Sequence, residues 1–294
     1  MKNTGIEIEN NAGFCPGVRK AVEIAEKELQ VEKELYCLGD IVHNPEEVKR
    51  LNSLGLRVIN REEFKKLKGV KVLIRSHGEP PETYKIAQSN KLKLVDSTCK
   101  VVGNLQKKVK LAWENISKKG GKIVIFGKTA HPETIGLNGQ INNEALIIQD
   151  VNETQYINFE KPVRLFSQTT MSPSVYHEII EECSRFAMKH NTDFDYQPSV
   201  CGWMVRRVDH LKSFARRQDT LIFVAGEKSS NGAFLFGVIR KVNPRAHKIS
   251  SIDQLKKDWL YAEKIGISGA TSTPGWQLEE VAQKIEEIQK NVSA

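Results

Sequence analysis

The sequence predicts an α/β protein of three similar domains, with mostly parallel sheets arranged about a pseudo-threefold axis. The first observation is an internal repeat: Cys15, Cys99 and Cys201 each end a short apolar stretch and divide the 294 residues into near thirds. The second is that a helical pattern and then an apolar run closed by glycine follow each cysteine. Strands that alternate with helices favour parallel sheets, whose carboxyl ends carry ligand sites. We expect the three repeats to bring those ends to one centre.

The elements of each repeat begin at its cysteine. The apolar stretches that end in cysteine are residues 6–15, 92–99 and 194–201. In the following segments, "PGVRKAVEIAEKEL", "KVVGNLQKKVKLAWENI" and "GWMVRRVDHLKSFA", apolar residues recur at three and four, as on one face of a helix. The glycine-closed runs that come next, each interpreted as a strand, are residues 34–39, 122–127 and 220–226.

Two further strands complete each repeat. A second strand is expected at 56–60, 145–150 and 246–250, then a helix, then a third strand ending in a polar cluster: "KVLIRSHGEPPE", "VRLFSQTTMSPS" and "KIGISGATSTPGW". The third repeat lacks a closing strand, because "QLEEVAQKIEEIQK" at the C-terminus is helical, and the N-terminal "IEIEN" is the natural substitute. The predicted domains are 14–98, 99–198 and 199–294, the last completed by residues 1–13.

Composition limits the class of protein. With 39% hydrophobic and 27% charged residues, the chain is typical of a globular protein. The N-terminus has no apolar signal region and no apolar run approaches the roughly 20 residues of a membrane helix, so we expect a cytoplasmic protein with no membrane partner. The net charge of +8 is spread along helical surfaces, which favours small anionic ligands or an acidic partner over nucleic acid.

The cysteines fall into two groups. Five scattered cysteines do not form a disulfide framework. Cys37 lies inside an apolar strand and Cys183 on an apolar helix face, so both are expected in the core. Cys15, Cys99 and Cys201 repeat at one register, which favours a shared role as metal ligands. Structural zinc and iron–sulfur clusters usually take four protein ligands, so three thiolates suggest a metal centre with one open position, without selecting the metal.

Polar residues follow the strand ends in every repeat. His43, His77 and His131 occupy these loops, and Ser229, Ser230, Asn231 and Ser272 fill comparable places in the last repeat. Such a set of donors suits phosphate oxygens. No Walker loop and no G-x-G-x-x-G motif is present, so nucleotide binding by these routes is unsupported. Glu133 is either a charge at a helix N-terminus or a catalytic carboxylate.

From Gly13 to Trp276 the chain resembles the 4-hydroxy-3-methylbut-2-enyl diphosphate reductases, iron–sulfur oxidoreductases of isoprene biosynthesis by the non-mevalonate pathway. The motifs that carry this resemblance are "GFCPGVRKAV", "HNPEEVKRL", "SHGEPPE", "DSTC", "HPETIGLNGQ", "SQTT", "KSSN" and "GATSTP". It implies a three-domain trefoil around one [4Fe–4S] cluster per chain, with Cys15, Cys99 and Cys201 as its ligands.

The same resemblance implies the other site residues and the reaction. The residues that would bind the diphosphate are His43, His77, His131, Ser229, Ser230, Asn231 and Ser272. Thr169 would contact the substrate hydroxyl and Glu133 would relay protons. The implied reaction removes the allylic hydroxyl with two electrons and two protons, giving isopentenyl and dimethylallyl diphosphates. Because the chain has no flavin or nicotinamide motif, electrons would come from a separate ferredoxin-like or flavodoxin-like protein.

Three positions depart from the family pattern. Met204 stands where a threonine is common, Arg206 where an asparagine is common, and Lys100 where a proline is usual, whereas Arg207 fits. Lys100 directly follows Cys99, and Met204 and Arg206 come shortly after Cys201. The departures are therefore expected to affect the surroundings of the ligands and the proton network near Cys201, and to leave the ligands themselves intact.

Two other functions use the same features. A three-cysteine cluster hydro-lyase would use the open iron without net electron transfer, but a carboxylate substrate would want arginines where these loops offer His, Ser, Thr and Asn. An iron–sulfur sensor or nucleic-acid binder would use the charge of +8 and predicts salt-sensitive binding, but gives no reason for three matched polar loops.

Overall fold

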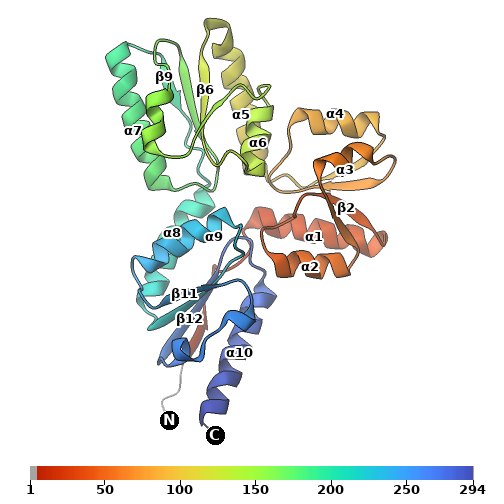
Figure 1. The fold of residues 1–294 in the computed structure, drawn as a ribbon, viewed down its shortest axis with the longest axis vertical. Helices are drawn as coiled ribbons and strands as arrows, with labels where there is room; N and C mark the ends of the chain where they lie inside the picture. The colour runs from red at the N-terminus through yellow and green to blue at the C-terminus, as the bar shows by residue number, and fades with distance from the viewer. Residues whose placement is uncertain (1–4, 294) are drawn as a thin grey trace. The chain divides into compact units, whose positions relative to one another are not determined.

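The computed structural model describes residues 5–293, so the first four residues of the expected N-terminal segment lie outside the described part. The chain divides into two compact units. One contains residues 5–34, 40–56 and 202–293, and the other contains residues 35–39 and 57–201. Figure 1 traces the chain from red at the N-terminus to blue at the C-terminus. Among the described helices, none combines the length and apolar composition needed to cross a membrane.

The described strands form three four-stranded sheets, and the prediction of three α/β domains with parallel sheets is confirmed. The sheet orders are β3-β2-β4-β5, β7-β6-β8-β9 and β11-β10-β12-β1. Each has the same plan, in which a central pair is flanked by the second strand on one side and a cysteine-leading strand on the other. The domain boundaries at 14–98, 99–198 and 199–294 stay a prediction.

All expected strands form. Those of the first repeat are β2 (Leu35–Leu38), β3 (Leu56–Ile59), β4 (Lys71–Ile74) and β5 (Lys93–Asp96). Those of the second are β6 (Lys122–Phe126), β7 (Leu146–Ile148), β8 (Val163–Ser167) and β9 (Phe194–Tyr196). Those of the third are β10 (Thr220–Val224), β11 (Ala246–Ile249), β12 (Lys264–Gly269) and the N-terminal β1 (Gly5–Ile8), which pairs in parallel with β12.

Amphipathic helices connect the strands. In the first repeat they are α1 (Pro16–Val31), α2 (Pro45–Ser53), α3 (Arg61–Lys66) and α4 (Pro81–Ser89). In the second they are α5 (Lys100–Ile116), α6 (Pro132–Gly139) and α7 (Pro173–His190), with the 3₁₀ turns η1 (Ser117–Lys119) and η2 (Val151–Tyr156). In the third they are α8 (Gly202–Arg216), α9 (Ser230–Arg240) and α10 (Gly275–Ser293), with η3 (Ile252–Gln254) and η4 (Lys257–Leu260).

The helix expected between the second and third strands forms only in the first repeat, as α3. In the second repeat the prediction of an α-helix is wrong, because the connection forms only the 3₁₀ turn η2. Asp150 caps the start of this turn, accepting from the N–H of Asn152 at 2.8 Å, and beyond its end Asn158 accepts from the N–H of Glu160 at 2.8 Å. In the third repeat the same connection is reduced to η3 and η4.

The sheet of β6 to β9 is covered on both faces (Figure 1). Helix α7 packs on one face through Tyr176, Ile179 and Cys183, and helices α5 and α6 pack on the other through residues such as Val109 and Leu137. The prediction that Cys37 and Cys183 are core thiols is confirmed, because neither is exposed to solvent. Burial raises the pKa of Cys183 to about 12.

A buried ion pair ties the N-terminal strand to the unit that holds the third sheet. The guanidinium of Arg207, on α8, pairs with the carboxylate of Glu9 just after β1. Arg207 also donates to the hydroxyl of Ser268 at 3.0 Å, and Ser268 donates to Glu9 at 2.7 Å. This closed network fixes the strand that completes the sheet.

Candidate active site

The three repeated cysteines each stand at the start of a long helix. Cys15 is the N-cap of α1, Cys99 is the N-cap of α5, and Cys201 directly precedes α8. All three are half-buried. None of the three helices has an acidic residue in its first turn. Because a helix N-terminus carries a partial positive charge, all three side chains lie in a locally positive field.

Equivalent backbone hydrogen bonds hold the three cysteines. The N–H of Cys99 donates to the carbonyl of Ser76 at 3.0 Å, and the N–H of Cys201 donates to that of Thr169 at 2.9 Å. The N–H of Cys15 donates to Thr271 at 3.3 Å. Each acceptor is the second residue after a third strand, β4, β8 or β12. The repeat predicted from sequence therefore extends to individual backbone bonds, while the convergence of the three sulfurs stays a prediction.

Two of the expected histidines lie side by side. The rings of His77 and His131 have centroids 5.3 Å apart and meet nearly edge to face. His131 is the N-cap of α6, and its Nδ1 accepts a hydrogen bond from the N–H of Glu133 at 3.2 Å. An accepting Nδ1 leaves the ring proton of the neutral imidazole on Nε2. His131 therefore offers an N–H donor on the side away from its own helix.

Glu133 and Thr169, expected as the proton-relay pair, are in direct contact. The carboxylate of Glu133 accepts from the N–H of Thr169 at 2.6 Å and from its hydroxyl at 2.9 Å. Glu133 is 2% exposed. Burial raises the pKa of Glu133 to about 7, against the lowering effect of the two Thr169 hydrogen bonds. Glu133 also lies in the first turn of α6, but its carboxylate is bonded to Thr169.

The polar residues of the third repeat form a second cluster. Ser229 caps α9, accepting from the N–H of Gly232 at 3.0 Å, and its hydroxyl lies 3.3 Å from that of Ser272. The hydroxyl of Ser272 lies 3.5 Å from the backbone carbonyl of His43, which places the expected histidine loop of the first repeat beside this cluster. Ser230, which follows the cap, is 8% exposed.

Asn231 has a fixed amide orientation. Its Oδ1 accepts from the N–H of Thr271 at 2.9 Å, and its Nδ2 faces the sulfur of Met204. Met204 is 2% exposed, whereas Arg206 is exposed. Of the two departures after Cys201, Met204 therefore contacts an expected site residue, through its thioether sulfur.

Glycines allow the His77 loop to pack against α6. Gly78 has φ +70°, and a Cβ there would lie 2.6 Å from Nε2 of Gln106. A Cβ on Gly139 would lie 2.3 Å from the Cβ of Pro80. Gln140 donates to the carbonyl of Glu79 at 3.4 Å. This close packing of backbone fixes the spacing of the loops that carry His77 and His131.

Sequence reasoning missed the glutamines that join these loops. Gln168 is not exposed, and its Oε1 accepts from the N–H of Lys128 at 3.1 Å and from the hydroxyl of Thr134 at 3.2 Å. Gln106 donates to the carbonyl of Glu79 at 3.5 Å. The available signal was a glutamine inside "SQTT" and another on the apolar face of α5, where a polar side chain needs a partner.

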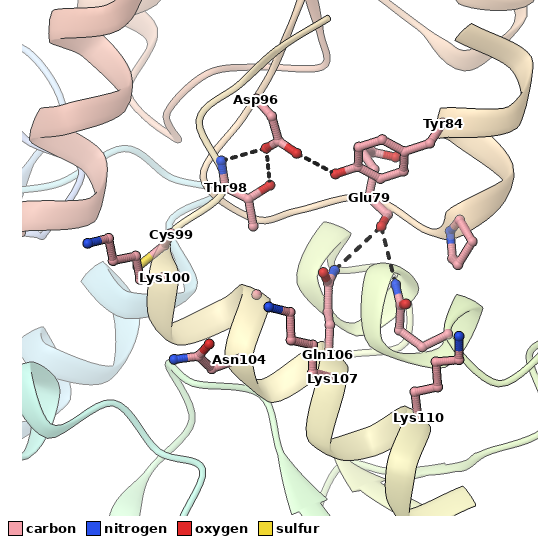
Figure 2. A pocket seen from close by; sticks show the side chains of 13 residues that line it. Glu79, Tyr84, Asp96, Thr98, Cys99, Lys100, Asn104, Gln106, Lys107 and Lys110 are labelled. Carbon is pink, nitrogen blue, oxygen red and sulfur yellow. Dashed lines mark hydrogen bonds between the residues drawn. The ribbon is translucent and has the colours of Figure 1, made fainter. Parts of the chain in front are cut away.

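A groove of about 700 Å³ reaches Cys99. Figure 2 shows Lys100, Asn104 and Lys107 of α5 along it. Tyr84 and Glu79 belong to the same lining. The groove gives access from solvent to the start of α5.

Comparison with known proteins identifies the family. A model of the LytB protein family matches residues 6–286. The chain is 44% identical over 283 residues to the 4-hydroxy-3-methylbut-2-enyl diphosphate reductase of Bacteroides fragilis, covering 95% of this chain and 97% of that one. It is 44% identical over 286 residues to the protein of the same name from Porphyromonas gingivalis, and this match covers 96% of this chain and 99% of that one.

Solved structures agree. The E-1-hydroxy-2-methyl-but-2-enyl-4-diphosphate reductase of Plasmodium falciparum superposes with a TM-score of 0.84 at 26% identity, over 96% of this chain and 87% of that one. A second structure, of the (E)-4-hydroxy-3-methyl-but-2-enyl diphosphate reductase described as the terminal enzyme of the non-mevalonate pathway, superposes with a TM-score of 0.72 at 30% identity. The match covers 97% of this chain and 99% of that one. Since the family model and relatives 44% identical both span nearly the whole sequence, the chain belongs to the LytB family of 4-hydroxy-3-methylbut-2-enyl diphosphate reductases.

Proposed function

We propose that this chain reduces 4-hydroxy-3-methylbut-2-enyl diphosphate to isopentenyl and dimethylallyl diphosphates at a [4Fe–4S] cluster held by Cys15, Cys99 and Cys201. The observation that carries the proposal is that these three thiols, and no other cysteine, start helices at equivalent backbone positions. In balance, R–OH + 2 e⁻ + 2 H⁺ gives R–H + H₂O. A separate acidic electron carrier supplies the electrons, because the sequence has no flavin or nicotinamide motif.

The donor set fits an iron–sulfur cluster. Three half-buried cysteines, each at a helix N-terminus without a first-turn acid, supply the sulfur ligands that iron–sulfur clusters take. The indole N–H of Trp203, two residues after Cys201, is buried and has no hydrogen-bond partner within the described residues. Sulfur atoms of such clusters accept hydrogen bonds of this kind. When bound, the cluster supplies electrons one at a time and an open, Lewis-acidic iron.

The polar loops supply donors for the diphosphate. The proposed set is His43, His77, His131, Ser229, Ser230, Asn231 and Ser272. The serines and Asn231 are at most 8% exposed, so their hydrogen bonds to phosphate oxygens would form with little competition from water. His131 presents its Nε2–H, since its Nδ1 is occupied by the N–H of Glu133. Neutral and charged N–H donors both suit a diphosphate.

Glu133 and Thr169 provide a proton route to the leaving oxygen. A hydroxyl leaves more easily as water than as hydroxide, so a proton must reach it. The pKa of Glu133 is raised to about 7, so a substantial fraction carries a proton near neutral pH. Protonated Glu133 donates to the hydroxyl of Thr169, which in turn donates to the substrate hydroxyl. The backbone N–H of Thr169 holds the carboxyl in place during the transfer.

Five single cysteine variants test the ligand set. Cys15→Ala, Cys99→Ala and Cys201→Ala are each expected to lose bound iron and dye-driven reductase activity after anaerobic reconstitution with iron and sulfide. Cys37→Ala and Cys183→Ala are matched controls from the core and should retain iron content. Full iron content and activity in any of the first three variants would overturn the assignment.

A further inference from the structure

The reaction proposed above consumes two electrons that must enter from outside the chain. We propose that one side of helix α5 is the docking surface for a small acidic protein that carries one electron at a time; this rests on the proposed reductase function. The α5 face, as we call it, consists of Lys100, Val101, Asn104, Lys107, Lys108 and Leu111. All six are exposed.

These six residues share one side of the helix. Positions 100, 104, 107 and 111, like 101, 104, 108 and 111, are separated by three or four, the spacing of neighbours along a helix surface. The face carries three lysines, and the next residue along this side of the helix, Glu114, lies 4.0 Å from Lys110 in an ion pair. Val101 is 44% exposed and Leu111 is 59% exposed. Exposed apolar side chains among like charges are the composition of a contact patch with a charged rim.

The charge of Lys100 is not explained by helix stability. Lys100 is the first residue of α5, and the first turn of this helix has no acidic residue. A cation at a helix N-terminus is unfavourable, because it adds to the positive end of the helix dipole. The ammonium group of Lys100 and the positive end of the dipole of α5 together create a positive potential directly beside Cys99. Such a potential attracts an acidic partner to the cysteine where an electron has the shortest way in.

The groove of about 700 Å³ shown in Figure 2 adds an opening at this point. Two carboxylates line it. Glu79, which is 1% exposed, pairs with Arg61 at 2.7 Å, whereas Asp96 accepts from the neutral hydroxyl of Tyr84 at 2.8 Å and keeps its own charge. The lysines of the same lining are Lys100, Lys107 and Lys110. Because these lysines outnumber the two carboxylates, the charge along the groove is net positive.

An acidic one-electron carrier fits this surface better than a small anion. The lysines extend along the helix from Lys100 to Lys108, which at 1.5 Å per residue is about 12 Å. Redox partners form small, short-lived interfaces, often below about 1,200 Å², and rely on charge to speed their encounters. Each encounter oxidises one reduced carrier by one electron, so two encounters supply the two electrons of one product.

The test compares two charge-reversal pairs on the same helix region. Lys100→Glu with Lys107→Glu changes the α5 face. Lys118→Glu with Lys119→Glu makes the same change in charge at the opposite end, roughly 25 Å along the helix from Cys99. The carrier is a purified acidic plant-type ferredoxin, and the small reductant is dithionite-reduced methyl viologen. Ferredoxin binding is measured by calorimetry at low salt, and anaerobic turnover is measured with each reductant.

The Lys100/Lys107 pair should weaken ferredoxin binding and lower the ferredoxin-driven kcat/KM by about tenfold or more. Viologen-driven turnover, which also reports any effect of Lys100 on the neighbouring Cys99, should fall by clearly less. The Lys118/Lys119 pair should leave both within about twofold. Ferredoxin-driven turnover of the unaltered chain should fall as salt rises. Thermal melting checks the fold. Lys100→Glu should not lower the melting temperature, because a carboxylate interacts favourably with the positive end of the helix dipole.

Three results would overturn the proposal: equal effects of the two pairs, no ferredoxin binding by the unaltered chain at low salt, or equal losses with ferredoxin and viologen. The last would mean that these lysines act on the reaction site. Absence of viologen-driven turnover in the unaltered, reconstituted chain would instead contradict the reductase function, and the binding measurement would still decide the docking surface.

Discussion

The carboxylate of Glu133 accepts hydrogen bonds from both the N–H and the hydroxyl of Thr169, at 2.6 and 2.9 Å. This pair predicts the behaviour of Glu133→Gln, which keeps an oxygen acceptor but cannot deliver a proton. Turnover should fall by roughly 10²-fold to 10⁴-fold, the usual loss of a general acid. Iron content and pyrophosphate affinity should stay nearly unchanged. Turnover equal to that of the unaltered enzyme would move the proton role to another group.

The same carboxyl should make stability depend on pH. Burial raises the pKa of Glu133 to about 7 from the ordinary 4.5. Between these values the folded chain holds a proton that the unfolded chain has lost, so the stability due to this proton is full below about pH 4.5 and is lost as pH rises through about 7. The free energy of unfolding, compared with that of Glu133→Gln, should fall by roughly 1 to 3 kcal/mol from pH 5 to 7.5. The prediction would be wrong if urea titrations gave the same difference in free energy of unfolding between the unaltered chain and Glu133→Gln at both pH values.

The packing of α6 on the His77 loop predicts a loss of anion binding in Gly139→Ala. The new Cβ would lie 2.3 Å from the Cβ of Pro80, so the loop must move and change the spacing of His77 and His131. We expect pyrophosphate binding, measured by calorimetry, to weaken about tenfold, with overpacking costing about 1 to 3 kcal/mol of stability. His77→Ala gives the effect of losing one donor outright.

Gly237→Ala is the matched control, because a Cβ there meets no atom within 4 Å and helices favour alanine. It should bind pyrophosphate normally and be at least as stable as the unaltered chain. If Gly139→Ala also bound normally, the close packing would have no part in setting the anion site.

The buried pair of Arg207 and Glu9 predicts a large stability effect. Arg207→Met would leave the carboxylate of Glu9, which is 7% exposed, without its cation, and should cost about 3 to 5 kcal/mol. Adding Glu9→Gln removes the stranded charge and should recover much of this loss. Denaturant titration of the single and double variants measures both; equal stabilities would mean that the pair contributes nothing to closing the third sheet.

The strands could be predicted because each is a short apolar run bounded by glycine or a polar cluster, as in "KIVIFG" and "TLIFVAG". The cysteine positions could be predicted because they repeat. The buried ion pair of Glu9 and Arg207 could not be predicted, because the two residues are 198 positions apart and each, taken alone, is typical of a charged surface residue. α-Helices after β7 and β11 were wrongly expected, because these connections form only the 3₁₀ turns η2, η3 and η4, and segments this short give no pattern that separates a 3₁₀ turn from an α-helix.

The packing of glycine on proline was equally hidden. Gly139 lies in a helix, and the need for glycine there comes from Pro80, which is distant in sequence. The spacing of residues in a sequence does not indicate which backbone segments pack closely together. Gln106, which bonds to the same carbonyl of Glu79 as Gln140, lies in none of the quoted motifs, and the motif that ends at Gln140 did not indicate this bond. The sequence indicates which side chains can donate hydrogen bonds in the expected site. The structure adds the hydrogen bonds that hold the loops of these side chains in place.

The proposed reductase function predicts the outcome of anaerobic turnover of the reconstituted chain with 4-hydroxy-3-methylbut-2-enyl diphosphate and a measured amount of reduced viologen. Two equivalents of the one-electron dye should be oxidised for each molecule of product, and the products should be isopentenyl and dimethylallyl diphosphates. Consumption of the substrate without oxidation of the dye would indicate hydro-lyase chemistry, and an unchanged substrate with a fully loaded cluster would contradict the reductase function itself.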